Sequence, residues 1–436
     1  MLNEERYFKI FWGAHTLSSL GTKMHQAALL WHIYTVSESV LALGLIGVAK
    51  LIPTLLLILV GGFIADRGKR RISLLIAQWS LAFVAIGLGL VSLWGLPEGY
   101  LLASIYITAV LTECASTFDG PARKSLIPLL VEPHRLAAAL SLTGISKNAS
   151  KLVGPALMGI MVAYVDIAWV YIVNGLSYLI VIFAILVIPK ELIDPVAYPN
   201  TLSDDDTVHP HNKIKKTEPF NKPKRFNLST IKEMYSEFWQ ALKEGFSFLW
   251  DSPILLSILS LDFVANLWAA ATVLLPVYAK DVLDLGSGGY GILASSIAAG
   301  GMVASAALLY LPDPVYKGRG VILGGILFGL GTILLGLSGN FLVSVLALAL
   351  IGASDQVSSV LRNTLHQLSL PNELRGRLTA INMIFTKSGP RLGEIEAGLA
   401  ASWLGLTPSI IFGGVACLLS VATIVYYYDE LWWHKA

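Results

Sequence analysis

The sequence contains little cysteine and little charge. Its 436 residues include two cysteines, Cys114 and Cys417, which lie far apart inside apolar runs with no metal-ligand spacing near either one. We therefore expect no metal and no cofactor. Charged residues make up 14% of the chain, against about 25% in a typical soluble protein. This deficit of charge argues against a soluble globular domain.

Motifs of several other protein classes are also missing. No Walker A pattern occurs, so nothing supports nucleotide-driven pumping by this chain, and no G-x-S-x-G nucleophile elbow is present. The net charge of +2 provides no basic field for nucleic acid. The segment that follows Tyr7 carries charged and polar residues that a cleavable signal core lacks. We expect neither an enzyme, nor a nucleic-acid binder, nor a signal peptide.

Long apolar runs take up most of the chain instead. Hydrophobic residues make up 55% of it, and stretches of about 20 apolar residues, enough to cross a hydrocarbon core of about 30 Å, recur throughout. They predict an all-α membrane protein with twelve transmembrane helices in two six-helix bundles. The predicted spans of the first bundle are 8–36, 41–64, 72–94, 101–118 and onward, 136–165 and 168–188. Those of the second bundle are 254–278, 290–311, 321–337, 341–365, 378–404 and 408–428.

Composition changes between the two bundles. Residues 190–230 are rich in Pro, Asn, Asp, His and Lys and cannot bury enough apolar surface to order themselves, which predicts a solvated linker. Residues 231–252 carry apolar and charged residues at helical spacing and predict an amphipathic interfacial helix. A Leu-x-x-Pro-x-x-Leu pattern closes the fourth helix of each half, at 130–136 and 368–374, as expected of a duplicated unit. The predicted domains are 1–189, 190–230, 231–252 and 253–436.

Lysine and arginine are distributed unequally between the two sides of the predicted spans. Short cytoplasmic loops retain positive charge, and the connections on one side are rich in it: Arg67, Lys69, Arg70, Arg71, Arg123, Lys124, Arg135, Lys317, Arg319, Arg375 and Arg377. The connections on the other side are acidic, with Lys280 as the only clear cation: Glu38, Glu98, Asp166, Asp281 and Asp284. We therefore predict a multi-pass protein of the plasma (inner) membrane, with both termini and the linker in the cytoplasm.

The most distinctive local pattern is GGFIADRGKRR at 61–71, between the second and third spans. It resembles the conserved cytoplasmic loop of the major facilitator superfamily, and the matching residues are Gly62, Ala65, Asp66, Arg67, Arg70 and Arg71. The chain departs from the family pattern at Lys69, which takes the place of a second glycine. The resemblance implies a conformational-switch loop, in which Asp66 contacts the start of the eleventh span near 376–378 and Arg123 is a second partner. The cations could instead serve only topology.

Two further segments resemble one branch of this superfamily. FDGPARKSLIP at 118–128 and RGR at 375–377 are similar to the branch that contains enterobactin exporters and macrolide efflux pumps. The resemblance covers nearly the whole chain outside the linker. It implies a twelve-helix fold, a cavity between the halves, and export of a small molecule driven by the proton gradient.

The fifth span carries part of the superfamily's antiporter motif. Gly154, Pro155 and Gly159 match it, whereas Ser150 and Met158 occupy positions where the motif has glycine. Gly and Pro in a membrane helix allow bending and close helix contact, which rocking between two states would need. The same residues could also belong to a helix that is merely packed.

Polar side chains inside the spans are costly and indicate a functional cavity. A carboxylate in low dielectric can exchange a proton near neutral pH, and the proton-coupling candidates are Glu113, Asp262, Asp355 and Glu394. Glu113 is the first choice, although it could equally form an ion pair with a lysine such as Lys23 or Lys151. The substrate-cavity candidates are Ser19, Lys23, Gln26, Lys147, Asn266, Arg362 and Lys387. The lysines among them could bind an anionic substrate or serve a structural role.

Together these features predict a proton-coupled secondary active exporter that works by alternating access. Its expected partners are a small-molecule substrate, protons and the lipid bilayer, and its expected functional unit is a monomer. A siderophore or a hydrophobic drug-like compound is the expected substrate. One alternative is uptake or another substrate, such as a lysophospholipid, a sugar or an anion. A membrane receptor that transports nothing is another, but an inert protein gains little from intramembrane charges.

Overall fold

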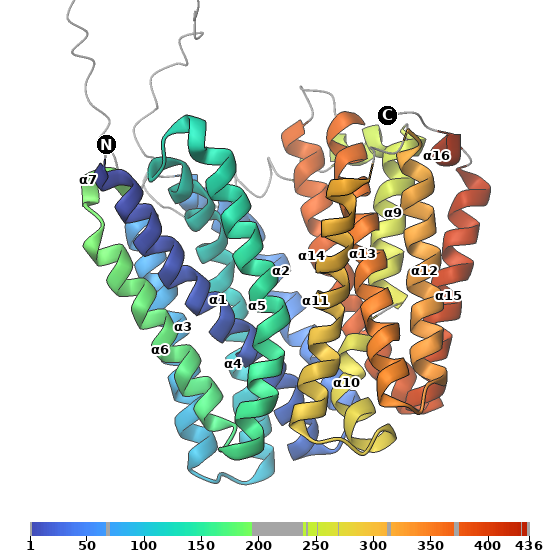
Figure 1. Cartoon of the computed structure of the whole chain (residues 1–436), viewed down its shortest axis with the longest axis horizontal. Helices are drawn as coiled ribbons and strands as arrows, with labels where there is room; N and C mark the ends of the chain where they lie inside the picture. The colour runs from blue at the N-terminus through green and yellow to red at the C-terminus, as the bar shows by residue number, and fades with distance from the viewer. Residues whose placement is uncertain are drawn as a thin grey trace, which may run out of the picture.

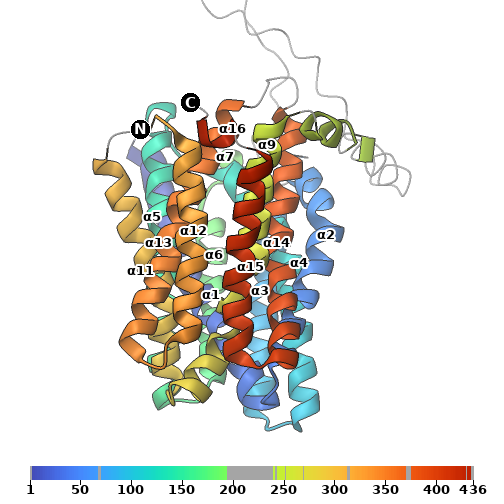
Figure 2. The same cartoon turned by 90° about the vertical axis from the view of Figure 1, so that its right-hand side faces the viewer.

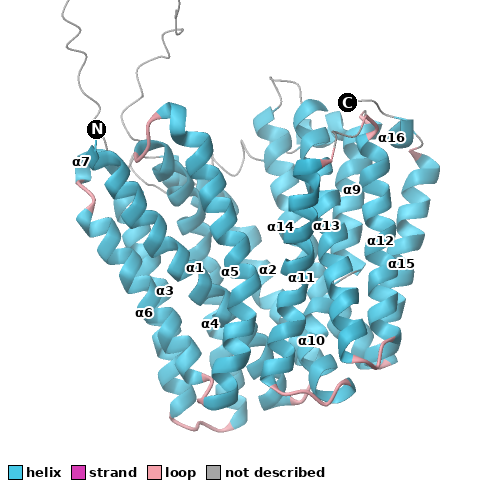
Figure 3. Cartoon of the chain, viewed as in Figure 1, coloured by secondary structure: helices cyan, strands magenta, loops and turns pink. Residues whose placement is uncertain are grey.

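The computed structural model describes residues 2–66, 70–193, 239–240, 243–250, 252–268, 270–311, 315–369, 375–428 and 430–433. Within these ranges the chain forms helices and connecting loops and contains no strand (Figure 3). This confirms the predicted all-α fold. Most of the predicted linker and half of the predicted amphipathic segment lie outside the described residues, so the domain boundaries stay predictions.

The first half contains six long helices, one for each predicted span. Short 3-10 turns η1 (Ile127–Leu129) and η2 (Pro133–Arg135) connect the fourth to the fifth, and the single turn α7 (Lys190–Ile193) follows the sixth. The long helices are α1 (Leu2–Ser37), α2 (Val40–Asp66), α3 (Arg70–Leu93), α4 (Glu98–Leu126), α5 (Leu136–Tyr164) and α6 (Ala168–Val187).

The second half repeats this arrangement. Its first membrane-length segment is composite and comprises α9 (Pro253–Trp268), η3 (Ala270–Leu274), α10 (Leu275–Val277) and η4 (Tyr278–Val282). The other long helices are α11 (Ser287–Tyr310), α12 (Lys317–Leu337), α13 (Phe341–Ser369), α14 (Arg375–Leu404) and α15 (Leu406–Tyr427), and the short α16 (Glu430–Trp433) follows.

The composite segment agrees with the predicted span at 254–278 and adds internal breaks that the sequence did not predict. The α-helix α9 ends at Trp268 and is followed by the 3-10 turn η3, the α-helical turn α10 and the π-helical turn η4. Pro276 accounts for one interruption within this segment, because proline donates no backbone hydrogen bond and its ring collides with the carbonyl four residues earlier, that of Thr272 in η3. An apolar run reveals the length of a span but not such an internal break.

The helices differ in polarity. In the described part of the chain, nine of the twelve membrane-length segments are apolar enough by composition to cross a membrane. The remaining three, α1, α5 and α14, carry intramembrane charges such as Lys23, Lys147 and Arg391. Charged groups inside a membrane usually face protein or water instead of lipid. These three helices are therefore the ones expected to line a functional interior.

The two halves form separate bundles that lean against each other (Figure 1). Both chain termini lie at the same end of the molecule, which we call the terminal end; the other we call the opposite end. The ribbons of the two bundles converge at the opposite end and diverge towards the terminal end (Figure 1).

Packing of buried side chains follows the same division. At the opposite end, one core cluster combines both halves, with Ile33 and Leu43 from the first and Tyr278 and Tyr290 from the second. The other clusters of described buried residues are each drawn from one half only. The halves are thus joined by a common core at the opposite end and have separate cores towards the terminal end.

Two helix crossings join the halves, α2 with α14 along one edge and α5 with α11 along the other (Figure 2). Both are contacts between glycines. A Cβ atom at Gly44 would lie 2.7 Å from Cα of Gly398, and one at Gly291 would lie 3.1 Å from Cα of Gly159. Glycine is required here because the backbones approach too closely for a side chain. Gly159, predicted as part of a bending motif, therefore lies at a contact between the halves.

Candidate functional site

An ion-pair cluster connects the two halves where α4 and α2 meet α14. Arg391 of α14 places Nη2 3.4 Å from Oε2 of Glu113 on α4, and Nη1 2.8 Å from Oε1 of Glu394 on its own helix. All three side chains are largely buried, with exposed fractions of 24%, 17% and 16%. Glu113 thus pairs with an arginine of the other half, and not with Lys23 or Lys151 as the sequence suggested.

Helix α2 completes this cluster from the first half. Thr54 Oγ1 donates to Oε1 of Glu113 over 3.1 Å, and Lys50, one turn earlier, interacts electrostatically with Glu394 and Glu113. Gly47 makes the approach possible, because a Cβ atom there would lie 2.5 Å from the carbonyl oxygen of Arg391. Lys50 and Thr54 were not among the residues predicted from the sequence. A lysine within an apolar span was the signal that could have revealed the first of them.

A second polar network lies inside the second half and gathers four predicted residues. Arg362 of α13 places Nη2 2.5 Å from Oδ1 of Asp262 on α9 and 4.0 Å from Oδ1 of Asp355. Asn266 Nδ2 donates to the carbonyl oxygen of Asp262 over 2.8 Å, and Arg362 Nη1 donates to Ser358 Oγ over 2.8 Å. Two proton-coupling candidates and two cavity candidates therefore form one connected group.

This network borders a small pocket of about 50 Å³ between α9, α13 and α14. Its lining is polar and includes Asp262, Arg362, Asn382 and Thr386. His366 also lines it, and its Nε2 is buried without a hydrogen-bond partner in the described part of the chain. The pocket can hold water or one small polar group.

The remaining cavity candidates lie on α1, α5 and α14. Lys23 Nζ donates to Oε1 of Gln26 over 2.7 Å, and Ser19 lies one turn before Lys23 and is half-buried. Lys147 of α5 and Lys387 of α14 are exposed and interact electrostatically with each other, although they belong to different halves. Lys147 and Lys387 therefore lie on opposite sides of the space between the bundles, and Lys23 interacts electrostatically with Arg391 of the other half.

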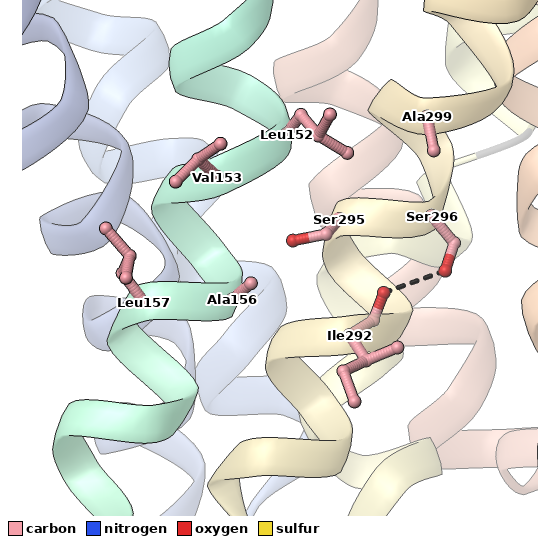
Figure 4. Close-up of a pocket in the computed structure, with 8 residues that line it drawn as sticks. All are labelled: Leu152, Val153, Ala156, Leu157, Ile292, Ser295, Ser296 and Ala299. Atoms are coloured by element: carbon pink, nitrogen blue, oxygen red, sulfur yellow. Dashed lines mark hydrogen bonds between the residues drawn. The ribbon is translucent and has the colours of Figure 1, made fainter.

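A groove on the edge of the molecule lies where α5 and α11 separate (Figure 4). Its volume is about 360 Å³, and aliphatic side chains such as Leu152, Leu157 and Ile292 dominate its lining. Ser296 Oγ donates to the carbonyl oxygen of Ile292 over 2.7 Å, whereas Ser295 Oγ points towards α5 and has no partner in the described residues (Figure 4). The groove is thus apolar, in contrast to the charged space between the bundles.

At the opposite end, contacts that the sequence did not predict close the interface. Tyr34 of α1 donates a hydrogen bond to Asp281 of η4. Lys280 Nζ lies 3.2 Å from Oε1 of Glu38 and 5.4 Å from the ring centroid of Tyr34. Tyr290 of α11 donates to the carbonyl oxygen of Ala27 over 3.3 Å. The signal in the sequence was Lys280, the only clear cation among the acidic connections of that side.

The predicted switch loop is only partly visible. Gly62 and Asp66 belong to the last turns of α2, but their side chains and Arg67 lie outside the described residues. Arg71, which with Arg70 begins α3, donates to the carbonyl oxygens of Ile188 and Leu186. The proposed contact of Asp66 with the start of α14 stays a prediction.

Arg123, the predicted second partner of Asp66, is held within the first half. Its Nη1 lies 2.8 Å from Nε2 of His15 and 3.5 Å from Oδ2 of Asp119. Asp119 in turn accepts a hydrogen bond of 2.7 Å from Gln78 Nε2. Arg123 thereby connects α4 with α1, and its side of the proposed latch also stays a prediction.

Comparison with known proteins adds to this geometry. A family described as "Transmembrane secretion effector" matches residues 3–204 and 225–432. The MFS-type transporter YfiS of Bacillus subtilis (strain 168) is 24% identical over 433 residues, which cover 94% of this chain and 90% of that protein. Enterobactin exporter EntS of Escherichia coli O1:K1 / APEC is 25% identical over 341 residues, which cover 78% of this chain and 72% of that protein.

The fold is also that of solved transporters. A bacterial homologue of the iron transporter ferroportin, in an inward-facing state, matches with a TM-score of 0.71 at 16% identity and covers 98% of each chain. The D-xylose-proton symporter matches with a TM-score of 0.70 at 13% identity and covers 99% of this chain and all of its own. By its sequence, by its two six-helix bundles and by the family that matches both halves, the chain belongs to the transmembrane secretion effector family of major facilitator transporters.

Proposed function

We propose that this transporter is a monomeric, proton-coupled exporter of a small organic molecule in the bacterial inner membrane. The terminal end, where Arg70, Arg71 and Arg135 lie, is the cytoplasmic end in this proposal, because short cytoplasmic loops retain positive charge. The structure then represents the inward-open state. Similarity to enterobactin exporters supports export as the direction.

One observation carries the proton coupling. The Arg391–Glu113 ion pair spans the two halves at a partly buried position beside the Gly44–Gly398 crossing. Opening of the opposite end must separate α4 and α2 from α14, and this breaks the pair. Protonation of Glu113 removes the charge that Arg391 contacts, so protonation and separation of the halves favour each other.

Glu394 has the same partner but a different geometry. It contacts Arg391 three residues away on α14, so this contact survives any rigid movement of the halves. Asp262 and Asp355 likewise pair with Arg362 inside one half. Glu113 is therefore the carboxylate whose ion pair spans the two halves, whereas Glu394 interacts with Lys50 of the first half without an ion pair among the described residues.

Transport into inverted membrane vesicles tests this proposal, because their lumen corresponds to the periplasm. An acidic lumen should drive accumulation of a probe, with enterobactin and erythromycin as the two probes. Glu113→Gln should abolish acid-driven accumulation and retain exchange without a gradient. Glu98→Gln, which removes an exposed carboxylate at the first residue of the same helix, is the matched control.

Two results would contradict the proposal. Accumulation that is the same with and without an acidic lumen would exclude proton coupling. Acid-driven accumulation that persists in Glu113→Gln and is lost in Glu394→Gln would show that Glu394, and not Glu113, couples transport to protons.

A further inference from the structure

A group of lysines lies at the space between the bundles and forms no ion pair with a carboxylate of the described residues. Helices α1 and α5 cross where a Cβ atom at Gly154 would lie 2.6 Å from Cβ of Lys23. Lys151 and Lys147 precede Gly154 on α5 by three and seven residues and share one side of that helix. Lys23, Lys147 and Lys151 are therefore neighbours, and Lys23 interacts electrostatically with both others.

Lys387 approaches this group from the second half. On α14 it lies four residues before Arg391 and seven before Glu394, so it shares the side of the helix that contacts the first half. It interacts electrostatically with Lys147. We call Lys23, Lys147, Lys151 and Lys387 the lysine cluster.

The carboxylates around the lysine cluster are already paired. Glu113 and Glu394 contact Arg391, and Asp262 contacts Arg362. Asp355 is exposed and interacts electrostatically with Lys151, but its Oδ1 also lies 4.0 Å from Nη2 of Arg362.

The charges at the interface therefore do not balance. Among the side chains of the lysine cluster and of the two ion-pair networks, seven basic groups stand against four carboxylates, a formal surplus of three positive charges. The cations are Lys23, Lys50, Lys147, Lys151, Arg362, Lys387 and Arg391, and the carboxylates are Glu113, Asp262, Asp355 and Glu394. In the described part of the chain, none of the four lysines of the cluster forms an ion pair.

A purely structural role does not explain this placement. Lys151 lies fifteen residues after the first residue of α5, Leu136, which is about 22 Å along the helix axis. Lys151 therefore lies near the middle of α5, far from both ends of the helix. Unpaired charges at such a depth are costly and are kept where they have a function.

The placement also creates repulsion across the interface. Lys147 and Lys387 carry like charges on opposite halves, so each opposes closure of the terminal end. An anion bound between them would neutralise this repulsion and allow the halves to approach. Binding of an anion therefore favours closure of the terminal end, and closure favours binding. A transporter needs this coupling between substrate binding and conformation.

We propose that the lysine cluster is the binding site for the substrate, and that the substrate is an organic anion. This inference rests on the proposed export function and specifies its substrate class. The site takes a molecule with at least one acidic group, which contacts Lys147 and Lys151 on one side and Lys387 on the other. A cationic drug is disfavoured by the same surplus of charge.

Fluorescence anisotropy with the transporter in lipid nanodiscs tests the proposal. The probes are 5-carboxyfluorescein, an anion, and rhodamine 123, a cation of similar size and ring structure. We expect 5-carboxyfluorescein to bind more tightly, and the double variant Lys147→Gln/Lys151→Gln to weaken its binding by about tenfold or more. Lys151→Arg keeps the charge and should stay within about threefold of the unmodified protein.

Lys190→Gln is the matched control, because it removes one exposed positive charge at α7, away from the interface. Equal binding of the two dyes, absence of 5-carboxyfluorescein binding, or an unchanged affinity in the double variant would each overturn the anion site. The double variant could unfold and so lose its circular dichroism signal for helix together with dye binding. Full binding in Lys151→Arg would then still support the anion site. If the dye preference fails while acid-driven accumulation in vesicles persists, only the substrate class is wrong. If the dye preference holds while acid-driven accumulation in vesicles is absent, only the proton coupling is wrong.

Discussion

Removal of the Tyr34 hydroxyl should weaken closure of the opposite end. Tyr34 is 5% exposed and donates to Asp281 on the other half. A hydrogen bond to a charged acceptor contributes about 1.5–3 kcal/mol. Asp281 is exposed, so water replaces the lost donor in part, and we take the lower value. Because the bond joins the two halves, Tyr34→Phe should lower the ratio of inward-open to outward-open molecules about tenfold.

The neighbouring ion pair is a poorer choice for this test. Glu38 and Lys280 are 74% and 40% exposed, and a surface pair of this kind contributes about 0–1 kcal/mol. Its loss would fall within experimental scatter. The buried tyrosine therefore gives the larger and more readily interpreted effect.

Spin labels at Gly99→Cys and Gly339→Cys, in a background that lacks Cys114 and Cys417, would report the distance between the halves at this end. Both glycines are exposed, and a Cβ atom at either one meets no atom within 4 Å. The long-distance population should grow in Tyr34→Phe and stay constant in Tyr164→Phe, which alters a tyrosine that is 85% exposed. An unchanged distance distribution in Tyr34→Phe, or an equal change in both variants, would refute the reasoning.

Two further predictions concern packing. Gly159→Ala should favour the outward-open state in the same distance measurement, because its Cβ atom would lie 2.5 Å from the carbonyl oxygen of Ser287; Gly144→Ala on the same helix meets nothing within 4 Å and should have no effect. Arg362→Met should lower the unfolding temperature of the purified protein, because it leaves Asp262, 9% exposed, without its partner at a cost of about 3–5 kcal/mol. The double variant with Asp262→Asn should recover most of that loss, and a double variant no more stable than the single one would contradict the pairing argument.

The sequence predicted the helices well because a membrane span has a simple physical signature. A run of about 20 apolar residues is long enough to cross the bilayer as a helix, whichever helices pack against it. Even α1, α5 and α14, the most polar spans, were found within a few residues of their bounds. The break after Trp268 was not predicted, because 3-10 and π turns retain the same apolar composition.

The site was predicted as residues but not as contacts. Asp262, Asp355, Asn266 and Arg362 were singled out one by one as costly intramembrane groups, and the structure brings them together. Which charges pair depends on the order, tilt and rotation of the helices, and a single sequence does not encode these in its local pattern. For this reason the partner of Glu113 was sought among lysines of its own half, whereas it is Arg391 of the other.

The surplus of positive charge at the interface also makes the empty transporter sensitive to voltage. A charge that crosses the whole membrane field gains about 2.3 kcal/mol per 100 mV. Each charge of the formal surplus that is present would gain that energy, scaled by the fraction of the field through which the access to the site changes. In a cell with a negative interior, this energy favours the state in which the site is open to the cytoplasm. If the proposed orientation and anion site are correct, the membrane potential returns the empty lysine cluster to the inside, and an anion that neutralises the cluster releases the transporter from that bias.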